Sequence, residues 1–381
     1  MFNSYFFLFS LLLFTTYIRY FEFGIVNVYI LFNILAIMLV AIEQKKLAIN
    51  RNLMFLFVFD FYVFLHLFFL TERYSSYVLL TISIMCSWVW CFIGENISWE
   101  KIIKITLFAF SMHLILAIMQ RISGLDFLFI SDSLGFFNGA EDGQILKQRV
   151  PGLSFISGNF YAPISLALAY LLRTHKKIFL IAVCIILYVN ISKVFIPSLL
   201  ILMLYDRFYV NKYGVKTIHL FMLVFLINVI GFTYAVIQYI GNPTLMSTFS
   251  SRALYLIYLI ENIKISPILG IGFDNFKEHV SIIYDEMNVL YFPHNPHNVF
   301  IKFLSELGIV GFTIFITAIY KGSKVPSYAK KDERIIVLSY AIYFILVQLS
   351  FHNFHFMSDI YIYIGLLVGI KSQIRYEKNE I

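Results

Sequence analysis

The feature that most constrains this chain is a series of apolar stretches that recurs along almost its whole length. A helix needs about 20 mostly apolar residues to cross a bilayer, and several stretches reach that length. Hydrophobic residues make up 60% of the 381 residues and charged residues only 13%, whereas soluble domains carry about 25% charged residues. The composition therefore excludes a soluble enzyme and a disordered chain, and it predicts an all-α polytopic membrane protein.

We expect about twelve transmembrane helices, two of them short. The predicted spans are residues 4–18, 24–42, 53–71, 75–94, 102–120, 157–173, 178–191, 194–205, 217–240, 298–320, 335–351 and 357–370. The first apolar stretch has no basic residues before it and no small-residue cleavage site after it. We therefore interpret it as a retained helix rather than a signal peptide.

The stretch from 178 to 205 fits either one long helix or two short ones that meet at 191–193. Basic residues flank it on both sides, and one long helix would place the two flanks on opposite faces of the membrane. Two helices would place both in the cytoplasm, as the positive-inside rule prefers. The flanks are Arg173, Lys176 and Lys177, and Arg207, Lys212 and Lys216. The charge pattern favours two helices, with both termini cytoplasmic.

The net charge of +7 does not indicate nucleic-acid binding. Such binding needs basic residues clustered on one face. Here they lie in short runs between apolar stretches, which is the topology signature of a membrane protein.

This topology divides the chain into five regions. They are an N-terminal bundle of five spans (1–120), a first outer loop (121–156), a group of spans (157–240), a large outer loop that we expect to be catalytic (241–297), and C-terminal spans with a cytoplasmic tail (298–381). Loops as long as these two are uncommon without a function or a fold of their own. We therefore expect the chemistry on the outer face.

Two cations lie at the outer ends of predicted spans. Arg149 precedes a Pro-Gly turn at the mouth of the next span. It is either an arginine that reaches the headgroups or an anion clamp, since a guanidinium matches phosphate oxygens bidentately. Lys193 lies between the two short spans, and a residue at that depth is either functional or directed outward.

A third cation, Arg252, follows two serines that suit the start of a helix running to Ile263. A positive charge in the first turn opposes the helix dipole. The arginine becomes favourable if a bound anion shares the site, because helix starts bind phosphate.

The most distinctive stretch runs from Pro293 to Phe312 and contains His294 and His297 at the outer entry to a span. A metal site would need more ligands than the nearby acids offer at a recognisable spacing. Histidine titrates near neutral pH and can accept a proton from a hydroxyl group. We interpret Glu306, further along this span, as a packing or helix–helix contact.

Three polar residues lie inside other apolar stretches: Asp60, His66 and His113. We interpret them as buried polar contacts between helices.

These motifs resemble the O-antigen ligase and polymerase family, the multi-span glycosyltransferases of the WaaL and Wzy type. The most specific part is H-N-V-F-I-K-F-L-S-E-L-G-I-V-G from His297, which follows the family pattern of His-Asn, an apolar run, Glu and Gly-x-x-Gly. Residues 267–272 are similar to the family's P-x-x-G-x-G turn, Arg252 to the arginine before it, and Arg149 to its R-x-x-G entry. Where the family shows Ser-Arg-Gly, this chain has a serine, Lys193 and a valine.

The resemblance implies a GT-C-like membrane glycosyltransferase with two longer outer loops, acting at the outer (periplasmic) face of the cytoplasmic (inner) membrane. It implies metal-independent, inverting transfer from an undecaprenyl-diphosphate-linked glycan, without a cofactor. One of the two histidines, His297 (which fits the downstream motif) or His294, would act as the base. Arg252 would be the other catalytic residue. The resemblance assigns diphosphate binding to Arg149, Arg252 and Lys193. A polysaccharide chain-length regulator is a candidate partner.

The acceptor separates the possible activities. A polymerase transfers the glycan to another lipid-linked repeat unit, and a ligase transfers it to lipid A core. Within the resemblance, the short connections outside the two long loops and the high Phe, Tyr and Ile content favour a polymerase. A flippase for the lipid-linked sugar is a third alternative, although intramembrane charge is sparse.

Overall fold

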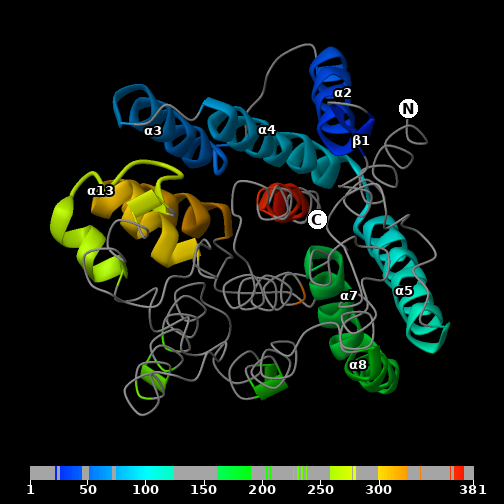
Figure 1. Ribbon diagram of the computed structural model, residues 1–381. Helices are drawn as coiled ribbons and strands as arrows, with labels where there is room; N and C mark the ends of the chain where they lie inside the picture. Colours follow the sequence, from blue (N-terminus) through cyan, green and yellow to red (C-terminus); the bar gives the residue numbers. More distant parts are fainter. Residues whose placement is uncertain are drawn as a thin grey trace.

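The computed structural model describes residues 22–23, 26–44, 51–70, 74–123, 161–189, 258–276, 278–279, 299–323 and 364–372, and several single residues between these ranges. Apart from one short strand pair, the regular elements in these ranges are helices (Figure 1). The helices are α2 (Val28–Gln44), α3 (Met54–Leu70), α4 (Tyr74–Asn96), α5 (Trp99–Ser123), α7 (Tyr161–Thr174), α8 (Lys176–Val189) and α13 (Val299–Ser323). Residues 258–265 and 364–372 are also helical.

Most predicted spans that fall on described residues coincide with helices. The bounds of α3, α4, α5, α7, α8 and α13 overlap the predictions closely. The span predicted from residue 24 starts late, because β1 (Glu22–Phe23) and β2 (Val26–Asn27) pair antiparallel and α2 begins only at Val28. The predicted spans 4–18, 194–205, 217–240 and 335–351 lie wholly or mostly outside the described residues, so the number of twelve stays a prediction.

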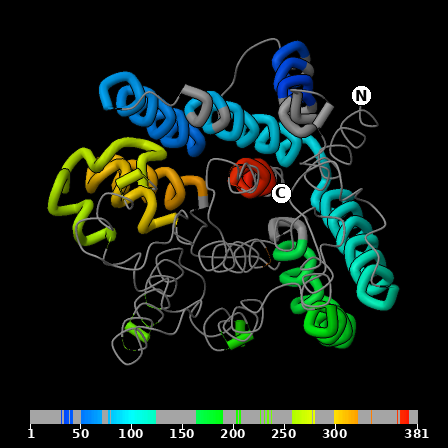
Figure 2. Tube along the Cα trace, in the orientation of Figure 1, coloured from blue at the N-terminus to red at the C-terminus, as the bar shows by residue number. Residues whose placement is uncertain are grey.

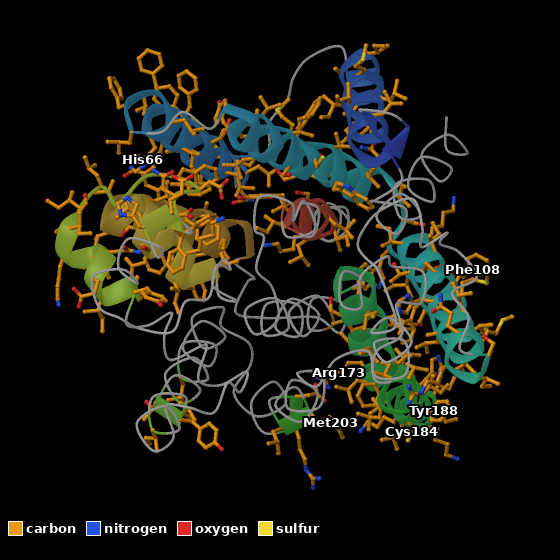
Figure 3. All side chains as sticks on the ribbon, viewed as in Figure 1. His66, Phe108, Arg173, Cys184, Tyr188 and Met203 are labelled. Carbon is orange, nitrogen blue, oxygen red and sulfur yellow. The ribbon has the colours of Figure 1, made fainter. Side chains whose placement is uncertain are left out.

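The surfaces of these helices are those of a membrane protein. α5 and α13 are each long and apolar enough to cross a bilayer. Large apolar side chains are exposed, among them Phe61 and Phe69 of α3 and Phe108 of α5. Figure 3 shows Phe108 on the outer side of α5. Soluble monomers rarely expose contiguous apolar patches of this kind. We therefore assign these faces to lipid.

An ion pair shows that the chain reverses direction after α8. Arg173, at the end of α7, lies 2.6 Å from Asp206 through its Nη2 and the Oδ1 of the aspartate. A single straight helix from 178 to 205 would carry its far end about 40 Å away, at 1.5 Å per residue. The contact excludes a single straight helix, and it places Arg173 and Asp206 at the same end of the bundle.

The helix formed by residues 364–372 lies near the centre of the described helices (Figure 2). Gly365 and Gly369, four residues apart, face α4, where added Cβ atoms would overlap the backbone of Ser87 and Cys91. Small residues at this spacing let two membrane helices approach closely. The Nζ of Lys371 donates to the carbonyl oxygen of Gly322 (2.9 Å), which ties this helix to the end of α13.

α3 and α13 form the contact that supports the candidate site. Phe59 of α3 packs against Phe303 and Phe315 of α13, with ring centroids 5.4 and 5.2 Å apart. Phe303 and Phe315 meet edge to face at 4.6 Å. Aromatic pairs in such arrangements contribute about 0.5–1.5 kcal/mol beyond their buried area. This aromatic cluster fixes α13 against the bundle.

Candidate functional site

The five predicted site residues lie outside the described residues. They are Arg149, Lys193, Arg252, His294 and His297. The structure does describe the scaffold next to three of them: the 258–265 helix that follows Arg252, the turn formed by residues 266–276 (the 266–276 turn), and α13, which begins just after His297. The site is therefore built from this scaffold outward.

α13 is broken at Gly308, in the middle of the span. The φ and ψ angles of Gly308 are 63° and −170°, a conformation that L-residues with a side chain rarely adopt. A Cβ on Gly308 would also overlap the carbonyl oxygen of Ile268. The break interrupts the helix's own hydrogen bonds, and unpaired backbone groups inside a membrane cost several kcal/mol each.

The 266–276 turn supplies acceptors for the amides released by this break. The amide of Ile309 donates to the carbonyl oxygen of Pro267 (3.0 Å), and that of Val310 donates to the carbonyl oxygen of Ile268 (3.3 Å). The first residues after the break are thus hydrogen-bonded to the turn instead of to their own helix.

The same turn supplies donors for the carbonyls before the break. The amide of Ile271 donates to Ser305 (3.1 Å) and that of Gly272 donates to Glu306 (2.9 Å). Both glycines of the P-x-x-G-x-G motif have positive φ, 81° at Gly270 and 105° at Gly272. A Cβ on Gly270 would overlap the backbone of Glu306. The two glycine motifs of the sequence therefore pair with each other.

The third carbonyl before the break is satisfied by α3. The hydroxyl of Tyr62 donates to the carbonyl oxygen of Leu307 at 3.1 Å and lies 3.3 Å from Nε2 of His66. Gly311 leaves room for the Tyr62 ring, which an added Cβ would meet. Figure 3 shows His66 on the side of α3 that faces α13.

Side chains reinforce the backbone pairing. The Nδ2 of Asn262 donates to Oγ of Ser305 at 2.8 Å, and the amide of Phe276 donates to Oε1 of Glu306 at 3.2 Å. Glu306 is fully buried, and its contact with the turn agrees with the structural role expected from the sequence. Asn262 and Phe276 link the two ends of the 258–276 segment to one short stretch of α13.

Lys302 completes a buried ion cluster at this contact. Its Nζ lies 3.1 Å from Oδ1 of Asp274 and 3.7 Å from Oε1 of Glu306. The Lys302 side chain is 1% exposed and that of Asp274 is 11% exposed. Asp274 itself has a φ of 63°, so the turn holds this aspartate in a conformation that is uncommon for a non-glycine residue.

The contacts also fix the direction of the 258–265 helix. Asn262 contacts Ser305, and Pro267, further along the chain, contacts Ile309, which is also further along α13. The 258–265 helix therefore runs parallel to α13. The two chain ends that lead to Arg252 and to His297 enter this unit from the same end.

His279 follows the turn and lies outside the spans. Its amide donates to the carbonyl oxygen of Asn275 (3.1 Å). Partial burial lowers the pKa of His279 below the usual value for histidine, so its imidazole is neutral at pH 7. The sequence analysis did not single out this histidine.

Residues 177–316 match the O-antigen ligase family. The resemblance seen in the sequence is thereby confirmed over this segment, which covers less than half of the chain. The matched segment begins in α8 and ends after the break in α13, so it contains the docked turn, Lys193, Arg252 and both histidines of the pair, while Arg149 precedes it. No curated protein matches the chain.

The sequence analysis missed two parts of this site. Lys302 is a charged residue inside an apolar run, four residues before Glu306. An ionisable residue at membrane depth with a partner at this spacing could have been recognised. The partnership with Asp274 could not, because it depends on how the turn docks. Asp60 makes the contact between helices expected of it, since Thr81 Oγ1 of α4 donates to Asp60 Oδ1 at 2.8 Å. His66 is buried as expected, and it contacts Tyr62 of its own helix.

Proposed function

We propose that this protein is a surface-polysaccharide (O-antigen) polymerase. It transfers an undecaprenyl-diphosphate-linked glycan to a lipid-linked repeat unit at the outer face of the cytoplasmic membrane. The observation that carries glycosyl transfer from a lipid-linked donor is the family match over residues 177–316, which includes the paired glycine motifs of the turn and α13. The high Phe, Tyr and Ile content favours the polymerase within that family.

The geometry around α13 supports a site that combines Arg252 and His297. The segments that follow these two residues are held together by backbone pairing and buried side-chain contacts, and they run in the same direction. A site that needs an arginine and a histidine close together would benefit from such a rigid base, because misplacing a reacting group by about 1 Å can cost 100-fold in rate.

The proposed reaction makes few demands on the protein. The acceptor hydroxyl attacks the anomeric carbon, the bond to the diphosphate oxygen breaks, and the anomeric configuration inverts. His297 accepts the hydroxyl proton. Arg252 and Arg149, with Lys193, stabilise the negative charge that develops on the departing diphosphate. A lipid diphosphate is already a good leaving group, so the step needs neither a metal nor a cofactor.

A ligase is the second candidate. The description of the matched family, O-antigen ligase, favours it. A ligase would use the same donor, base and cations, and would differ only in transferring the glycan to lipid A core.

The surface-glycan ladder of a deletion strain separates the candidates. We expect single repeat units on the core, which indicates loss of a polymerase. Accumulated lipid-linked polymer with naked core would identify a ligase instead. Loss of all surface glycan, with repeat units trapped inside the cell, would identify a flippase and contradict glycosyl transfer.

The role of Arg252 is tested in the complemented deletion strain. Arg252→Lys keeps the charge and loses the bidentate fork, so we expect strongly reduced glycan assembly at normal membrane abundance. The matched control is Lys264→Arg, on the exposed surface of the 258–265 helix, which should behave as wild type. Full activity of Arg252→Ala would contradict the assignment.

A further inference from the structure

The buried lysine at the turn is surrounded by carboxylates of the protein itself. Lys302 contacts Asp274 in the 266–276 turn and Glu306 one helical turn further along α13. Removing one partner of a buried ion pair is strongly destabilising, because the remaining charge is left without compensation. Here one cation serves two carboxylates, one on each side of the contact.

We propose that Lys302 is a positioning residue that holds the 266–276 turn, and through it the segment bearing Arg252, at a fixed place along α13. The inference rests on the proposed function. Lys302 does not contact substrate in this assignment, because its ammonium group is buried against Asp274 and Glu306.

The backbone pairing alone does not account for this lysine. The hydrogen bonds across the break already satisfy the interrupted helix, so the backbone pairing does not itself need a charge at position 302. A neutral residue would, however, leave two carboxylates buried side by side at the contact. If both are ionised they repel each other, and if one takes up a proton it loses its ionic partner; either outcome weakens the attachment of the turn to α13, and the lysine prevents both.

The first experiment measures glycan transfer by purified variants from lipid-linked repeat units. Lys302→Met should lose activity on the order of 100-fold, the effect expected when a site is misplaced by about 1 Å. Asp274→Asn should lose less, because Lys302 and Glu306 then remain paired. The neutral triple variant Asp274→Asn, Lys302→Met, Glu306→Gln should be at least about tenfold more active than Lys302→Met, since no uncompensated charge remains.

The triple variant distinguishes positioning from substrate binding. A lysine that bound the diphosphate could not be replaced by neutralising two carboxylates, so the triple variant would then stay as inactive as Lys302→Met. That result would overturn the proposal. Full activity of Lys302→Met would overturn it as well.

The second experiment measures docking without relying on activity. Spin labels on Ile260→Cys and Thr313→Cys, both exposed sites, report the distance between the 258–265 helix and α13 in a background where the exposed Cys184 is replaced by serine. The distance distribution should be narrow in wild type, broad in Lys302→Met and narrow again in the triple variant. An unchanged, narrow distribution in Lys302→Met would overturn the proposal.

The two readouts separate this inference from the proposed function. If the wild type transfers no glycan, the proposed function fails while the spin-label distances still test the lysine. If Lys302→Met does not accumulate in the membrane, normal accumulation of the triple variant supports the charge argument, and its absence contradicts it.

Discussion

Glycine shapes several helix contacts among the described residues, and two of them differ in kind: one between the 266–276 turn and α13, the other between α4 and residues 364–372. In the first, Gly270, Gly272 and Gly308 have positive φ, and the backbone around them exchanges hydrogen bonds across a broken helix. In the second, Gly365 and Gly369 belong to an unbroken helix and only make room for a neighbouring backbone. The first contact needs glycine for its conformation and the second for its small size. We therefore expect the first to control activity and the second to control stability.

The largest effect should come from the chemistry that the first contact supports. His297→Ala should lower the rate of glycan transfer by about 10²–10⁴-fold, the usual contribution of a general base. His294→Ala should lower this rate less, because His294 lies outside the motif that continues to Glu306 and Gly308. Wild-type activity should fall below about pH 6.5, where imidazole protonates and can no longer accept a proton. Initial rates across pH, with EDTA present, check all three expectations.

His279→Gln provides the control for this pH profile. Burial lowers the pKa of His279, so its removal should leave the acid limb near pH 6.5 unchanged. A wild-type rate in His297→Ala together with an inactive His294→Ala would show that the other histidine of the pair is the base.

The next largest effect should come from the break in α13. Gly308→Ala forces a side chain into a positive φ and against the carbonyl oxygen of Ile268, so the turn should undock. We expect a loss of rate on the order of 100-fold, as for a displaced catalytic group. Thr313→Ala, at an exposed position of the same helix, is the control. Near-normal rates in Gly308→Ala would mean that activity does not require the docked turn.

A substitution in the second contact should separate stability from activity. Gly369→Ala places a methyl group against the Cys91 carbonyl oxygen and the backbone of Gly94. Overpacking of this kind costs about 1–3 kcal/mol. We expect a lower thermal midpoint in detergent, with kcat and KM unchanged at a temperature where the protein remains folded. A fall in kcat without a shift in the midpoint would contradict the division between the two contacts.

The smallest effect should come from the hydroxyl that joins α3 to the break. Tyr62→Phe leaves the Leu307 carbonyl without its donor, a loss of about 1–3 kcal/mol for a buried group. Thermal unfolding should shift by a few degrees, whereas Tyr188→Phe, on an exposed face of α8, should not shift it. Equal midpoints for the two variants would indicate that another donor replaces Tyr62.

The sequence predicted the helices well where the apolar pattern alone determines them, as for α3, α5 and α13. It also identified the P-x-x-G-x-G turn and the Gly-x-x-Gly motif. It did not predict that these motifs pair with each other, because a periodic apolar pattern from residue 298 to 320 conceals a break at Gly308. The strand pair before α2 was missed for a similar reason, since its apolar residues read as helix.

The contacts with Asp274 and with α4 were unpredictable in another way. The partnership of Asp274 with Lys302 joins residues that are distant in the sequence, and no local pattern marks it. The close approach of Gly365 and Gly369 to α4 follows a recognisable spacing, but the spacing alone does not say which helix is the partner.

The pairing of the turn with α13 has a consequence for how this segment tolerates change. Backbone groups make the contact at Pro267, Ile268 and Ile271. The side chain of Ile268 is exposed, so many different side chains fit there without altering the contact. Inserting or deleting a single residue between Gly272 and Asp274 is different, because it would shift Asp274 and Phe276 away from Lys302 and Glu306 together. In a library of variants, this segment should accept substitutions at Ile268 more readily than any change in its length.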